Sequence, residues 1–119
     1  MNRSLLTATI TLSLTLVARS VAAQEPAAAP DGAALYRQNC RSCHGARGKP
    51  SQQMSGVYPS LVTLSDSAVQ AKLTVDGVAA LLTNGNGKEM KPFADKMSKD
   101  EIRAVAEFVK TLKPATGAP

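Results

Sequence analysis

One pentapeptide constrains this chain more than any other feature. Cys40-Arg41-Ser42-Cys43-His44 has two cysteines separated by two residues, and a histidine directly follows the second. If residues 32–44 form a helix, these three side chains stand at positions i, i+3 and i+4 and share one face. Two thiols beside an imidazole suit covalent attachment of a haem, with the histidine bound to the iron. The motif therefore predicts a c-type haem attachment site.

Other uses of a Cys-x-x-Cys pair fit this sequence less well. A zinc site needs four ligands, and the chain has only two cysteines and one histidine. A thioredoxin-like redox pair expects a strand before the motif, whereas residues 32–40 have a helical pattern. A plain disulfide between Cys40 and Cys43 stays open in an oxidising compartment, but it leaves the position of His44 to coincidence.

Residues 1–23 have the features of a secretory signal peptide. Arg3 gives a short positive region, residues 5–17 are apolar and Thr-rich, and Val21-Ala22-Ala23 supplies small residues before the cleavage point. We expect cleavage near Ala23 and a periplasmic protein; the alternative is a retained leader that anchors the chain. The apolar run is short for a membrane span, and we expect no transmembrane segment in the mature chain.

The composition predicts one small domain with a thin core. The chain has 119 residues, with two Phe, two Tyr and no Trp, so a buried porphyrin would supply apolar area that the side chains lack. We therefore expect the haem-free mature chain to fold poorly. Removal of Arg3 and Arg19 with the leader lowers the formal net charge of +5 by two. Haem propionates would lower it further, which argues against nucleic acid as a partner.

The mature chain divides into three segments. Residues 24–30 are Ala/Pro-rich and read as a flexible tail, residues 31–113 form the domain, and residues 114–119 form a disordered tail. In the domain, Asp31 is an expected N-cap for a helix through the motif, and Gly45, Gly48 and Pro50 should end that helix. We expect residues 45–60 to be a loop, followed by short helices over 66–73 and 76–84.

The last helix is the best-defined element in the sequence. Ser98 and Glu101 form a capping box at its start, and Pro114 stops it. Apolar residues follow the helical rhythm at Ile102, Val105, Ala106, Val109 and Leu112. This apolar stripe needs a partner, and we expect the first helix to supply it, with Gly32 near Val105 and Phe108.

Two loops offer further groups to the expected haem site. Pro59 has no N–H, but its carbonyl can accept the Nδ1–H of His44 and so fix the imidazole. Met90 stands before Lys91-Pro92 in a loop that follows a Gly/Asn-rich turn, and its thioether can supply a sixth iron ligand. Met97 is its rival, but it directly precedes Ser98 and is expected to act as a hydrophobic staple. We expect Met54, in a polar stretch, to fill a gap or lie on the surface.

Taken together, these residues resemble a class I c-type cytochrome of the short bacterial monohaem type. The match covers about residues 31–113, and its specific parts are Gly32 and Tyr36, the motif through Gly45, residues 56–61, residues 90–93 and the terminal helix. The resemblance implies an all-α cytochrome c fold, with three to five short helices around one covalently bound haem and with the N- and C-terminal helices crossing.

The resemblance also assigns site residues. It implies that His44 and Met90 are the axial ligands, that the carbonyl of Pro59 holds His44, and that Leu61 and Phe93 lie at the cofactor. Two departures are small: family members often have Met-Pro where this chain has Met90-Lys91-Pro92, and an acidic residue where this chain has Arg47.

The expected function is single-electron transfer in the periplasm rather than catalysis. Partners would be redox proteins such as a dehydrogenase, a cytochrome complex or an oxidase, met by a monomer or by a subunit of a complex. One alternative is a haem subunit of a periplasmic dehydrogenase or oxidase complex; another is a ligand-binding or peroxidase-like protein with an open sixth position. A set of basic residues could steer acidic partners or simply form a solvated face: Arg41, Arg47, Lys49, Lys88, Lys91 and Lys96.

Overall fold

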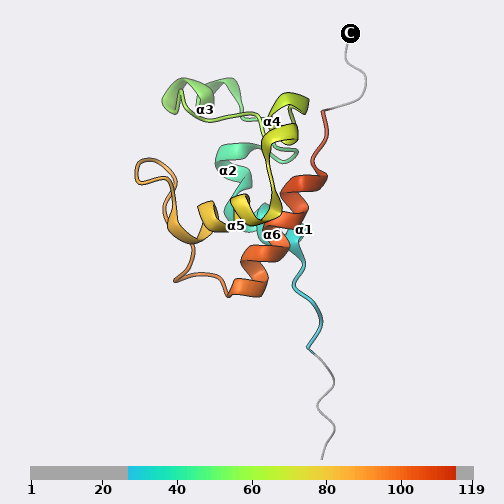
Figure 1. Cartoon of the computed structure of the whole chain (residues 1–119). Coiled ribbons are helices and arrows are strands. Elements are labelled where there is room, and N and C mark those ends of the chain that lie inside the picture. The colour runs from blue at the N-terminus through green and yellow to red at the C-terminus, as the bar shows by residue number, and fades with distance from the viewer. Residues whose placement is uncertain (1–26, 115–119) are drawn as a thin grey trace, which may run out of the picture.

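The protein is helical throughout the part of the chain that the structure describes. The structure is a computed structural model and describes residues 27–114. Within that range there are six helices and no strand. Figure 1 shows how the helices are arranged. The helices are α1 (Gly32–Asn39), α2 (Arg41–His44), α3 (Gln52–Val57), α4 (Ser67–Lys72), α5 (Val75–Asn84) and α6 (Lys99–Thr111). The all-α prediction is confirmed, and the expected leader over residues 1–23 lies outside the described residues.

The helix count exceeds the predicted three to five for two local reasons. The expected first helix is interrupted at Cys40, whose backbone (φ −117°, ψ −30°) departs from helical values. Helix α3 lies inside residues 45–60, which were expected to be a loop. Its start is set by Ser51, whose Oγ accepts the N–H of Met54 at 3.2 Å. The segment has no apolar periodicity, so this capping bond is the feature that starts the helix.

Helix α6 is the main support of the core. Its capping box is present: the N–H of Glu101 donates to Ser98 Oγ at 3.2 Å, and the N–H of Ser98 donates to the Glu101 carboxylate at 2.8 Å. The predicted apolar stripe is buried along its whole length: Ile102, Val105, Ala106, Val109 and Leu112. Burying a valine or isoleucine side chain contributes about 1.5–3 kcal/mol, so this stripe provides much of the core's apolar stabilisation.

Helices α1 and α6 cross at Gly32, as predicted. A Cβ atom built on Gly32 would lie 2.0 Å from the carbonyl oxygen of Ala104 and 3.2 Å from Cβ of Phe108. Only glycine therefore allows the two backbones to approach this closely. The rings of Tyr36 and Phe108 pack beside the crossing, with their centroids 5.2 Å apart. This crossing fixes the first helix, and with it the chain that leads into the cysteine motif.

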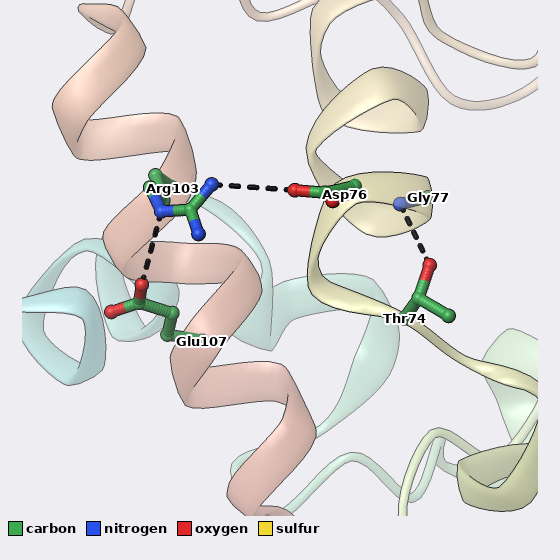
Figure 2. Close-up of polar contacts among 5 residues, drawn as sticks. All are labelled: Thr74, Asp76, Gly77, Arg103 and Glu107. Atoms are coloured by element: carbon green, nitrogen blue, oxygen red, sulfur yellow. Dashed lines mark hydrogen bonds and ion pairs between the residues drawn. The ribbon is translucent and has the colours of Figure 1, made fainter.

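The second face of α6 packs against α5. Figure 2 shows the polar contacts there: Arg103 pairs with Asp76 at 3.3 Å and with Glu107 at 3.2 Å. The same view shows Thr74 Oγ1 accepting the N–H of Gly77 at 3.0 Å, which caps α5. Exposed ion pairs contribute only about 0–1 kcal/mol. The packing therefore depends mainly on Val78 and Leu82, which are buried.

Helix α4 is joined to α6 by polar contacts with the backbone. Asp66 caps α4, and Gln70 donates from Nε2 to the carbonyl oxygen of Val109 at 2.9 Å. Lys110 donates from Nζ to the carbonyl oxygen of Gln70 at 2.8 Å. Between residues 27 and 114 no helix has both the length and the apolar character needed to cross a bilayer.

Candidate functional site

The cysteine motif occupies the junction of α1 and α2. Cys40 lies between the two helices, and Cys43 and His44 end the second. The carbonyl oxygen of Cys40 accepts the N–H of Cys43 at 3.2 Å and that of His44 at 2.9 Å. The three residues therefore belong to one helical turn, although the helix before them is interrupted. This is the i, i+3, i+4 relationship that the sequence predicted.

Two further residues hold this turn in place. Gly45 ends α2 with φ 77°, and a Cβ there would lie 2.0 Å from the carbonyl oxygen of Lys49. The hydroxyl of Tyr36 donates to the carbonyl oxygen of Gly45 at 2.9 Å, and its residue is fully buried. Burial, together with the Cys40 thiol, raises the pKa of Tyr36 to about 12, so the phenol stays a donor. This role of Tyr36 was not among the predictions, although a tyrosine four residues before the first cysteine is visible in the sequence.

The two thiols are free and differ in exposure. Cys40 is buried, Cys43 is partly buried, and no disulfide joins them. Burial, followed by the influence of Cys43, raises the pKa of Cys40 to about 11. A redox-active cysteine in a Cys-x-x-Cys pair has a lowered pKa instead. Among residues 27–114 no three His, Cys, Asp or Glu side chains are arranged to hold a metal ion. The thioredoxin-like and zinc alternatives therefore lack support.

His44 carries an unpaired nitrogen. Its Nδ1 atom is buried and has no hydrogen-bond partner among the described residues. Leaving such a group unpaired costs about 1–3 kcal/mol. Burial also lowers the pKa of His44, which favours the neutral imidazole that metal ligation requires. A neutral imidazole whose Nδ1 is buried and unpaired, beside two free thiols, fits a bound haem.

The predicted hydrogen bond from His44 to Pro59 is not formed in this structure, where His44 Nδ1 has no hydrogen-bond partner among the described residues. Pro59 lies in a turn after α3, closed by the N–H of Leu61, which donates to the carbonyl oxygen of Tyr58 at 3.0 Å. In this turn Pro59 is exposed and Leu61 is partly buried. The role of the Pro59 carbonyl as an acceptor for His44 stays a prediction, and so does a contact of Pro59 or Leu61 with the cofactor.

Met90 lies in a loop whose shape is set by Asn86. The Asn86 side-chain oxygen accepts the N–H of Met90 at 2.9 Å and that of Lys88 at 3.0 Å, and the N–H of Asn86 donates to the carbonyl oxygen of Met90 at 3.0 Å. Gly85 begins the loop at φ 69°, and a Cβ there would lie 2.5 Å from the Met90 carbonyl oxygen. The loop is thus a closed, ordered turn, and the thioether of Met90 packs partly buried against the core.

The rest of the loop separates the two candidate methionines. The N–H of Phe93 donates to the carbonyl oxygen of Leu82 at 2.8 Å, and the Phe93 ring is partly buried against the core. Met97 is buried in the core cluster with Ile102 and directly precedes the cap residue of α6. This is the position expected of a hydrophobic staple. Met97 is therefore committed to packing, whereas Met90 remains in a loop.

A contact between loops joins the two sides of the candidate site. The hydroxyl of Ser60, in the turn after α3, donates to the carboxylate of Glu89. Glu89 directly precedes Met90, and Ser60 directly follows Pro59. The loop that carries Pro59 and the loop that carries Met90 are therefore linked to each other. No local sequence pattern indicated this contact, because it depends on how two loops pack against each other in the folded chain.

Comparisons with known proteins agree with the fold and the motif. A family model described as cytochrome c oxidase, cbb3-type, subunit III matches residues 27–109. The chloroplastic cytochrome c6 of Chlamydomonas reinhardtii is 35% identical over 120 aligned residues, which cover 97% of this chain and 72% of that protein. The cbb3-type cytochrome c oxidase subunit FixP of Azorhizobium caulinodans is 29% identical over 85 residues, or 71% of this chain and 27% of FixP.

Solved structures give the same result. The KustC0563 c-type cytochrome superposes with a TM-score of 0.63 at 30% identity, covering 71% of this chain and 99% of that one. A mutant of the same cytochrome superposes with a TM-score of 0.61 at 29% identity. The chain therefore belongs to the cytochrome family whose model matches residues 27–109, and it is a class I c-type cytochrome. Membership implies haem c as its cofactor and electron transfer as its role.

Proposed function

We propose that the protein is a periplasmic single-electron carrier with one haem c, attached through Cys40 and Cys43 and bound at the iron by His44 and Met90. The observation that carries this proposal is the single helical turn that presents two free thiols and an imidazole whose Nδ1 is buried and unpaired. When bound, haem c supplies a one-electron iron couple. The proposed location depends on the leader expected over residues 1–23.

The chain's own residues would perform three tasks. Cys40 and Cys43 would hold the cofactor covalently, so that its retention does not depend on the thin apolar core. His44 would bind as a neutral imidazole, held in position by the turn that Gly45 and Tyr36 stabilise. Met90 would supply a thioether, which raises the reduction potential relative to harder ligands. We also propose that Pro59, Leu61 and Phe93 line the cofactor.

A potentiometric titration of the purified protein tests this function. Two axial protein ligands leave no free position for a small substrate, so we expect a reversible one-electron transition and no carbon monoxide binding to the reduced protein. Rapid carbon monoxide binding together with peroxidase activity would contradict the proposal and favour a ligand-binding haem protein.

The second candidate function is that of a cytochrome c subunit in an oxidase complex. The family model and FixP both carry cbb3-type oxidase descriptions, although this chain spans only 27% of FixP. Co-purification with a catalytic subunit would favour this candidate, and isolation as a monomer would favour a free carrier. Either protein would meet redox partners, and six exposed basic residues surround the motif and the Met90 loop: Arg41, Arg47, Lys49, Lys88, Lys91 and Lys96. If these charges steer acidic partners, added salt should slow electron transfer steeply.

The link between Ser60 and Glu89 gives a testable restraint on Met90. Removing it with Ser60→Ala should loosen the loop and raise the affinity of the oxidised protein for imidazole, which competes with the thioether. We expect about a threefold change, since such a hydrogen bond contributes about 0.5–1.5 kcal/mol. The measurement is an optical imidazole titration. Ser67→Ala is the control, because Ser67 is also exposed; equal affinities in both variants would refute the restraint.

A further inference from the structure

A hollow of about 310 Å³ lies where three segments of the chain meet. Ala46, Arg47 and Lys49 line it from the loop after α2, Ser65 from the turn before α4, and Lys113 from the end of α6. The loop that contributes the first three residues begins directly after the cysteine motif.

The walls of the hollow are fixed by Gly48. This glycine is buried and has φ 78°, and a Cβ there would lie 2.8 Å from Cδ1 of Leu112 and 3.1 Å from Cβ of Leu64. Its carbonyl oxygen accepts the N–H of Ser65 at 3.4 Å. The loop after α2, the turn before α4 and the end of α6 are thus packed together at one point. The cavity beside that point is formed by the fold itself.

The lining of the hollow has an unbalanced charge. It contains three cations, Arg47, Lys49 and Lys113, and no carboxylate. Both ion pairs found among residues 27–114 involve Arg103 instead. Like charges gathered around a cavity repel one another and create a local positive potential. An anion in the hollow would relieve this repulsion.

Ser65 adds a hydroxyl to the lining of the hollow. The residue is 5% exposed and is the one polar residue that is buried in the described part of the chain. A serine hydroxyl can donate one hydrogen bond, so a ligand oxygen in the hollow would find a donor beside the three cations.

We propose that this hollow, which we call the anion pocket, binds a tetrahedral oxyanion of the phosphate class. Arg47, Lys49 and Lys113 would neutralise its charge from three segments, and the Ser65 hydroxyl would donate to one of its oxygens. A compact dianion suits three cations better than a single carboxylate does, because it balances more of the charge. Its oxygens also point in several directions, which suits donors that come from three segments of the chain.

Isothermal titration calorimetry of the haem-loaded protein with orthophosphate, at low ionic strength, tests whether the anion pocket binds phosphate. We expect saturable binding at one site, competition by sulfate and little competition by chloride. Arg47→Gln and Lys113→Gln should each weaken phosphate binding by about tenfold, the loss typical of a charge-assisted hydrogen bond. Ser65→Ala should weaken it by about fivefold, with thermal unfolding measured to confirm that the variant is folded.

Matched control variants distinguish phosphate binding in the anion pocket from a general effect of net charge. Lys88→Gln and Lys91→Gln remove the same charge from exposed residues of the Met90 loop, and they should leave the phosphate affinity within about twofold of the original value. The proposal is overturned if orthophosphate shows no saturable binding, or if the control variants weaken binding as much as Arg47→Gln does. Neither result depends on whether the protein transfers electrons.

Discussion

Replacing Cys40 and Cys43 together by alanine is expected to give an exported protein without covalently bound haem. The two thiols lie on one helical turn and are not joined to each other, so both are available for attachment. The change should also destabilise the fold, because the chain has two Phe, two Tyr and no Trp to fill its core. We expect the variant to lose most of its helical signal at a temperature where the original protein is folded.

Circular dichroism measures the loss of helical structure. The haem absorbance that stays with the polypeptide after denaturation measures covalent attachment. Ser42→Ala is the matched control, because Ser42 lies between the cysteines and is exposed. It should keep both the haem and the helical signal. A double-alanine variant that still carried haem through acid-acetone extraction would show that the attachment lies elsewhere.

Replacing Met90 by alanine is expected to have the second largest effect. It should abolish the weak long-wavelength absorption of the oxidised protein that marks a methionine–iron bond. It should also lower the reduction potential, since axial ligands set that potential over a range of about 0.8 V. The loop around Met90 should survive the change, because Asn86 and Gly85 hold its backbone independently of the side chain.

Met97→Ala distinguishes ligation from packing. Met97 is 6% exposed and belongs to the core cluster, so truncating it should destabilise the protein by about 2–5 kcal/mol while leaving the absorption band in place. Optical spectra and thermal unfolding of both variants are the measurements. If the band is lost in the Met97 variant and kept in the Met90 variant, the ligand assignment is reversed.

The elements that local patterns govern were predictable from the sequence. The capping box and apolar stripe of α6 and the approximate ranges of α4 and α5 follow from residues within one or two turns of one another. The Gly32 crossing was also predicted, because a glycine opposite a long apolar stripe implies close approach. These predictions succeeded because they depend on capping residues, apolar spacing and glycine, whose effects are set by the local sequence.

The failures have a common physical cause. The interruption at Cys40 and the short helix α3 are set by single residues, Cys40 and Ser51, rather than by periodicity. The link from Ser60 to Glu89 depends on how two distant loops pack, which no local pattern encodes. The anion pocket is a similar case, because its lining comes from three segments that meet only in the folded chain.

The mass of the purified, exported protein, taken together with a pyridine haemochrome assay, tests the central claim most directly. We predict the mass of the chain after removal of the leader plus one haem, and one haemochrome per chain. A colourless protein with the mass of the polypeptide alone, two hydrogens lighter because Cys40 and Cys43 are joined as a disulfide, would contradict the account.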